Sequence, residues 1–71
     1  MYFLGKNLKF LRKSKDLSQQ RLAEELEITR DMINSLENKD ANPSFTTLIK
    51  IRNYFNVNLD DLIFMDLENK S

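Results

Sequence analysis

The chain alternates between apolar residues at helical spacing and small polar residues that favour the ends of helices. Leu4, Leu8 and Leu11 lie three or four positions apart, which predicts a first helix over about residues 3–15. Asp16 follows at a position where a helix often ends in a left-handed residue, a conformation that aspartate tolerates better than most non-glycine residues. We therefore expect this helix to stop at Asp16.

Two short helices are predicted next, and each is preceded by a hydroxyl side chain that can cap its first turn. Ser18 precedes the second helix, which ends near residue 26, and Thr29 precedes the third, which ends near residue 38. A tight turn over residues 27–28 joins the two helices. Their inward-facing apolar residues are Leu22, Ala23, Leu26, Ile33 and Leu36.

Two further helices follow a loop-like segment that contains Pro43. Ser44 is expected to cap the fourth helix and Asn58 the fifth. We expect the tail over about 68–71 to be frayed. The pattern predicts one all-α domain over residues 1–71, with five short helices around one core. The inward-facing residues are predicted to be Phe45, Leu48, Ile51 and Phe55 in the fourth helix, and Leu59, Leu62 and Ile63 in the fifth.

The composition excludes several kinds of chemistry. The 71 residues include no cysteine, no histidine and one glycine. Disulfides, thiolate metal sites, the commonest general base and glycine-rich phosphate loops are therefore excluded. No apolar run approaches the roughly 18 residues of a spanning helix, and charges from Lys6 onward argue against a signal peptide. We expect a cytoplasmic protein that is not an enzyme and has no membrane partner, cofactor, metal or small-molecule ligand.

The charge is balanced overall but unevenly distributed. Eleven basic and eleven acidic residues give a net charge of zero and a pI of about 6.2. This balance argues mildly against nucleic-acid binding, because phosphate contact usually needs a basic excess. Uneven charge allows a basic face on a neutral protein, although a solvated helix surface is the simpler explanation. Against Asp16 alone, residues 1–16 hold Lys6, Lys9, Arg12, Lys13 and Lys15.

The predicted third helix carries polar residues, including Arg30, Asp31 and Asn34, that the helix does not need for its own stability. Arginine can bind guanine, asparagine can pair with adenine, and aspartate can accept from cytosine. Asparagine is also a poor residue for a helix interior, so Asn34 favours a functional role. Arg30 and Asp31 could instead be ordinary surface residues of a first turn. The short join between two hydroxyl-capped helices is typical of a helix-turn-helix, whose second helix enters the major groove.

Residues 17–63, LSQQRLAEELEITRDMINSLENKDANPSFTTLIKIRNYFNVNLDDLI, resemble the phage-repressor family of helix-turn-helix domains (Cro and lambda-repressor-like, Xre). The start LGKNLKFLR resembles the first helix of that family, so the similarity covers roughly residues 4–63. It implies a five-helix lambda-repressor-like DNA-binding domain with its helix-turn-helix at about 18–38. The matching features are Leu17-Ser18-Gln19, Leu22-Ala23, Leu26, Ile28-Thr29, Ile33, Leu36-Glu37, Pro43-Ser44, Leu48, Ile51 and Leu62.

The resemblance also implies roles for particular residues. It places a base-contacting set at Gln19, Arg30, Asp31, Asn34 and Ser35. Residues near helix ends can hold phosphates through side chains or backbone N–H groups, and these are Ser18, Thr29, Asn38, Lys39, Asn42 and Ser44. Lys39 could instead be a solvated loop charge. Arg12 and Glu37 occupy positions where the family joins its first and third helices by a partly buried ion pair; the alternative is two unpaired surface charges.

The sequence departs from the family pattern in two places. Glu27 stands in the turn where the family often has glycine, and a left-handed conformation there would cost roughly 1–2 kcal/mol. The family also favours small residues near Arg52 and Tyr54.

We expect a DNA-binding transcriptional regulator, a repressor that binds a two-fold operator as a homodimer through the helix at about 29–38. Phe64 and Met65 are the candidate dimer surface, although they could equally cover the edge of the core. The alternative function is a helix-turn-helix fold used as a protein-interaction or antitoxin-like module, which the acidic Glu24 and Glu25 favour. Salt-dependent binding to duplex DNA would separate the two.

Overall fold

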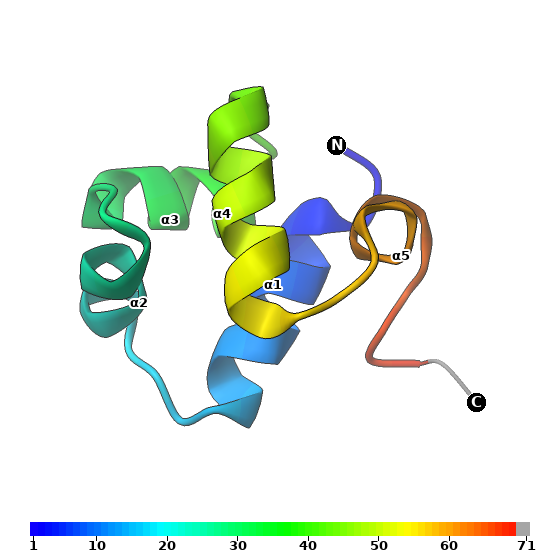
Figure 1. Cartoon of the computed structure of the whole chain (residues 1–71), viewed down its shortest axis with the longest axis horizontal. Helices are drawn as coiled ribbons and strands as arrows, with labels where there is room; N and C mark the ends of the chain where they lie inside the picture. Colours follow the sequence, from blue (N-terminus) through cyan, green and yellow to red (C-terminus); the bar gives the residue numbers. More distant parts are fainter. Residues whose placement is uncertain (70–71) are drawn as a thin grey trace.

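The computed structural model describes residues 1–69, and all the secondary structure in that range is helical (Figure 1). Two helices lie on one side of the first, and the last lies on its other side. None of these helices is long and apolar enough to cross a membrane. The five predicted helices are confirmed, and they are α1 (Leu4–Ser14), α2 (Gln19–Leu26), α3 (Arg30–Asn38), α4 (Phe45–Phe55) and α5 (Leu59–Phe64).

The four predicted helix caps are all formed. Ser18, Thr29 and Ser44 each accept a hydrogen bond from the backbone N–H three residues later, at 3.0 to 3.2 Å. Asn58 accepts one from the N–H two residues later, at 2.8 Å. Each such cap stabilises a helix by about 1 kcal/mol, so the helix starts are specified locally.

All five helices contribute to the core: α3 packs on α1 and α2, α4 packs on α2 and α5, and α5 packs on α1. The prediction that Phe45 points into this core is wrong, because its side chain is 70% exposed. Phe45 is the first residue of α4, and that end of the helix projects past the neighbouring helices (Figure 1), which agrees with the exposure of its side chain. The buried apolar residues are Leu4, Leu8, Leu22, Ala23, Leu26, Ile33, Leu36, Leu48, Ile51, Phe55 and Leu62.

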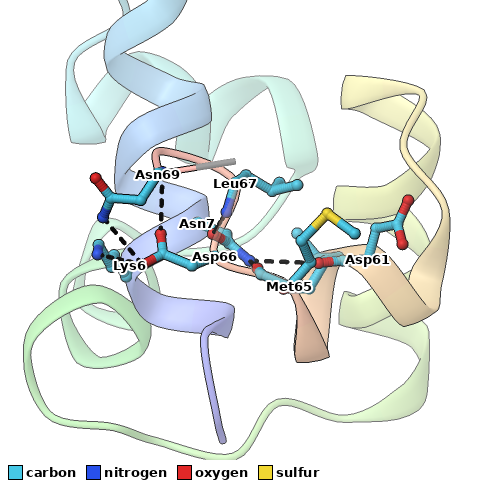
Figure 2. Close-up of polar contacts among 8 residues, drawn as sticks. Lys6, Asn7, Asp61, Met65, Asp66, Leu67 and Asn69 are labelled. Carbon is cyan, nitrogen blue, oxygen red and sulfur yellow. Dashed lines mark hydrogen bonds and ion pairs between the residues drawn. The ribbon is translucent and has the colours of Figure 1, made fainter. Parts of the chain in front are cut away.

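A buried polar residue that the pattern did not predict joins α1 to the end of the chain. The Asn7 side chain is 0% exposed, and its Nδ2 donates to the carbonyl oxygens of Leu62 and Met65 at 2.7 and 2.6 Å. Its Oδ1 accepts from the N–H of Leu67 at 3.0 Å (Figure 2). Both ends of the amide are therefore satisfied, and the segment after α5 is bound to α1.

The part of the predicted frayed tail that the structure describes is residues 68–69. Glu68 and Asn69 lie in a turn, and the N–H and side chain of Asn69 both donate to Asp66. Lys6 Nζ lies 2.7 Å from the same carboxylate (Figure 2). The hydrogen bond from the Asn69 side chain and the contact with Lys6 hold the pKa of Asp66 below its ordinary value. Residues 70–71 lie outside the described residues.

The single glycine allows α1 to approach the end of α3 closely. A Cβ atom built on Gly5 would lie 2.4 Å from the carbonyl oxygen of Leu36, which no real side chain could tolerate. Glycine is therefore required at this helix crossing.

The turn between α2 and α3 uses Glu27 instead of glycine in a left-handed conformation. Glu27 has a φ of 58°, and its N–H bonds to the carbonyl oxygen of Glu24 at 3.2 Å. The next N–H, of Ile28, bonds to the carbonyl oxygen of Ala23 at 3.0 Å. This paired pattern closes the end of α2, so the left-handed turn considered for Glu27 is formed despite the cost of a side chain there.

Arg12 and Glu37 form a two-pronged ion pair between α1 and α3. Arg12 Nε lies 2.8 Å from one Glu37 carboxylate oxygen, and Nη2 lies 3.0 Å from the other. The side chains are only 10% and 0% exposed. Arg12 Nη1 also donates to the carbonyl oxygen of Leu17 at 2.8 Å, which brings the segment before α2 into the same contact.

We predict strong coupling between Arg12 and Glu37 in a double-mutant cycle of Arg12→Met and Glu37→Gln. Removing one partner leaves a buried charge and should lower the free energy of unfolding by about 3–5 kcal/mol. Coupling measured by urea denaturation should exceed the roughly 0.2–1 kcal/mol of exposed pairs. Arg21 and Glu25, an exposed pair 3.3 Å apart, give the matched control cycle. Additive effects at Arg12 and Glu37 would contradict a buried pair.

We predict that Glu27→Gly raises the free energy of unfolding by up to about 1 kcal/mol. Glycine relieves the left-handed strain, and the greater freedom of the unfolded chain offsets part of that gain. Chemical denaturation measures the balance, and Glu24→Gly, within α2, serves as the control and should destabilise by about 1 kcal/mol. A clear loss of stability in Glu27→Gly would show that the Glu27 side chain contributes more than its strain costs.

Candidate nucleic-acid interface

The helix α3 has one buried face and one open face. Ile33 and Leu36 are buried against the core, at 0% and 1% exposure. Arg30 and Asp31 are exposed on the opposite side of the first turn. Because α2 packs across α3 and Glu37 is bound to Arg12, the direction in which this open face points is fixed.

The middle of the open face is formed by Asn34 and Ser35, which are half-buried. Asn38 Nδ2 donates to Asn34 Oδ1 at 2.8 Å, one turn along the helix. That oxygen has a second lone pair, and the Asn34 nitrogen keeps both hydrogens. The bond therefore orients the Asn34 amide without preventing the paired contact that asparagine makes with adenine.

Gln19 is less available than the resemblance implies. Its side chain is half-buried, and Nε2 donates to Glu37 at 3.2 Å. The amide thus joins the Arg12–Glu37 ion pair, and its oxygen and second N–H hydrogen are left for another partner. Gln19 is also the first residue of α2, where the backbone N–H has no partner within the helix. A backbone contact at Gln19 needs no change in this arrangement.

The hydroxyl groups proposed for phosphate contact differ in what they can still donate. Ser18 and Thr29 accept hydrogen bonds as caps, so their own O–H hydrogens remain available. The Ser44 hydroxyl donates to the Thr47 hydroxyl at 3.1 Å, so the N–H groups at the start of α4 are what Ser44 offers. Asn38, Lys39 and Asn42 are exposed at or beyond the end of α3.

Two further features bear on this surface. Asp31 has a structural explanation, because a carboxylate in the first turn of α3 interacts favourably with the helix dipole. Met32, an apolar residue of α3, is 38% exposed. An apolar side chain on this side of α3 is of the type that contacts the methyl group of thymine.

The candidate dimer surface lies away from α3, at the end of α5. Phe64 is 58% exposed, and its ring lies 4.9 Å from the ring of Tyr2. Met65 is half-buried, and its carbonyl oxygen accepts the hydrogen bond from Asn7. Phe64 therefore belongs to an exposed aromatic cluster with Tyr2, and Met65 belongs mainly to the attachment of the tail.

Residues 8–62 match the family model described as helix-turn-helix. An uncharacterized HTH-type transcriptional regulator of Bacillus subtilis, YqaE, is 43% identical over 59 residues, which are 83% of this chain and 51% of that protein. The chain thus spans about half the length of this relative.

Solved structures show the same arrangement of helices. The N-terminal DNA-binding domain of SinR from Bacillus subtilis has a TM-score of 0.78 and 28% identity, covering 87% of this chain and 91% of that one. The restriction-modification controller protein C.AhdI from Aeromonas hydrophila has a TM-score of 0.74 and 27% identity, covering 84% and 91%. A LexA repressor from Eubacterium rectale, at 22% identity and a TM-score of 0.82 over 97% of this chain and 73% of that one, shares the fold.

The family and these named relatives are regulators and DNA-binding domains, which agrees with the expectation that the chain is not an enzyme. The match to the family model, the helices and the turn at Glu27 all lead to one assignment. The chain belongs to the Xre, or lambda-repressor-like, family of helix-turn-helix domains.

Proposed function

We propose that this protein is a sequence-specific DNA-binding transcriptional regulator, acting as a repressor on a two-fold operator. The observation that supports this most directly is the open face of α3, which combines Arg30, Asp31, Asn34 and Ser35 on a helix whose other face is buried. These side chains suit base edges in the major groove. The names of its regulator and DNA-binding relatives agree with this proposal.

Specificity and affinity come from different parts of the interface in this proposal. Arg30 and Asn34 read bases, and Asp31, Ser35 and Gln19 complete the base-contacting set. Phosphates position the domain through hydroxyls, loop side chains and N–H groups at helix starts. The residues of this phosphate set are Ser18, Thr29, Asn38, Lys39, Asn42 and the backbone at Ser44.

A protein-interaction role is the second candidate, and one observation favours it. Glu24 and Glu25 are exposed on α2, and Glu25 borders a hollow of about 390 Å³ beside Lys50 and Tyr54 on α4. Titration with random duplex DNA at two salt concentrations separates the candidates. A DNA-binding protein loses affinity steeply as salt rises, and a protein-interaction module shows no measurable duplex binding at either concentration.

We predict that Arg30→Ala and Asn34→Ala each weaken binding to the cognate site by about 1–3 kcal/mol and relax preference at one base position. The site comes from selection of bound sequences from a random duplex pool. Affinities for that site and its single-base variants provide the measurement. Full sequence preference in both variants would show that this face does not read bases.

Lys39→Ala tests the phosphate set with the same duplexes. It should weaken binding to all sequences alike and flatten the slope of log affinity against log salt by about 1. An unchanged slope would remove Lys39 from the set.

We predict that Phe64→Asp shifts a dimer of this protein towards monomer. The exposed ring cluster of Phe64 and Tyr2 is apolar surface that a second copy can cover. Sedimentation across a range of protein concentrations gives the association constant. Phe45→Asp, which places a charge on another exposed aromatic, at the start of α4, is the control. If both variants and the unmodified protein have the same association constant, this surface does not form a dimer interface.

A further inference from the structure

Among residues 1–69, two lysines on the outer face of α1 form no ion pair. Lys6, Lys9 and Lys13 line a hollow of about 520 Å³, with Phe10 as an apolar neighbour and Glu68 as an acidic one. Lys6 pairs with Asp66, but within residues 1–69 neither Lys9 nor Lys13 forms an ion pair. Lys15, near the same end of the helix, lies over the ring of Tyr54 at 5.4 Å. Lys9 and Lys13 are therefore the unpaired charges of α1.

The position of Lys9 follows from its neighbours along the helix. Gly5 touches the carbonyl oxygen of Leu36, and Arg12 binds Glu37, so the flank of α1 between them runs beside the last turn of α3. Lys9 stands four residues after Gly5 and three before Arg12, on that flank. Its exposed side chain emerges beside the end of α3, from which Asn38 and Lys39 also emerge.

Lys13 lies one turn further, beside the entrance to α2. Arg12 Nη1 donates to the carbonyl oxygen of Leu17, which draws this end of α1 against the residues that lead into α2. Leu17 is followed by Ser18, the exposed N-cap of α2, and by Gln19, the first residue of that helix. Lys9 and Lys13 thus extend, on a neighbouring helix, the row of groups that the proposed function assigns to phosphate contact.

We propose that Lys9 and Lys13 bind backbone phosphates of duplex DNA just outside the bases that α3 reads, so that α1 forms a second, sequence-independent contact. This inference rests on the proposed function. The neutral chain has no general excess of positive charge, so attraction to DNA depends on where its cations lie. Lys9 and Lys13 carry two positive charges against the one negative charge of Glu68 in the same hollow, so a local positive excess remains there.

The double variant Lys9→Gln with Lys13→Gln tests the contact. Its matched control is Lys15→Gln with Lys50→Gln, which removes the same charge from residues that surround Tyr54. Affinity is measured against salt on two duplexes with the selected site, one extended by flanking base pairs and one trimmed to the site. Circular dichroism and urea denaturation establish that both double variants are folded.

On the extended duplex, the Lys9 and Lys13 variant should flatten the slope of log affinity against log salt by about 2, or about 1 for each phosphate contact. On the trimmed duplex this variant and the unmodified protein should have the same slope, and the control should match the unmodified protein on both. An unchanged slope on the extended duplex would overturn the inference, as would equal flattening by the control. Failure of the unmodified protein to bind either duplex would instead overturn the proposed function.

Discussion

The buried ion pair between Arg12 and Glu37 is the contact on which the arrangement of the helix-turn-helix depends. A single guanidinium binds Glu37 of α3 through two nitrogens and the carbonyl oxygen of Leu17 through the third. Gln19, at the start of α2, binds the same carboxylate. Buried pairs gain little net stability over well-packed apolar residues, but breaking one is costly. The network therefore specifies how α1, α2 and α3 meet more than it stabilises the domain.

That arrangement explains why the open face of α3 has a defined direction. The glycine at position 5 lets α1 lie against the carbonyl groups at the end of α3, where the ion pair is formed. At the other end of α3, the left-handed Glu27 turns the chain sharply enough for Thr29 to cap the helix. Both ends of α3 are thus fixed by specific contacts, which set its orientation in the domain. A rigid helix suits recognition, because base edges must be met within hydrogen-bonding distance.

The same helix α1 also controls the far end of the domain. Asn7 satisfies three backbone groups of α5 and the segment after it, and Lys6 binds Asp66 just beyond. A buried amide without these partners would cost about 1–3 kcal/mol, so the segment is attached firmly. The aromatic cluster of Phe64 and Tyr2 is held in place by this attachment. One helix therefore supports both the face proposed for DNA and the surface proposed for a second copy.

Sequence by itself determined the features that depend on neighbouring residues. The number of helices, their caps and the left-handed Asp16 follow from spacing and from short-range preferences, whereas the left-handed turn at Glu27 was indicated by the resemblance to the family. The resemblance to the family also placed Arg12 opposite Glu37.

Contacts between distant segments were decided only by the tertiary structure. In the sequence, Asn7 is an ordinary polar residue, and its role appears only when α5 packs against it. Gly5 likewise looks only unfavourable for a helix, and its role appears because a Cβ atom at that position would lie 2.4 Å from the carbonyl oxygen of Leu36. Phe45 has the spacing of a core residue, but it is exposed because its end of α4 extends past the core. Gln19 is partly buried because its side chain donates to the carboxylate of Glu37, eighteen residues away. A helical pattern specifies which residues share a face, but the neighbour of that face depends on how the helices pack.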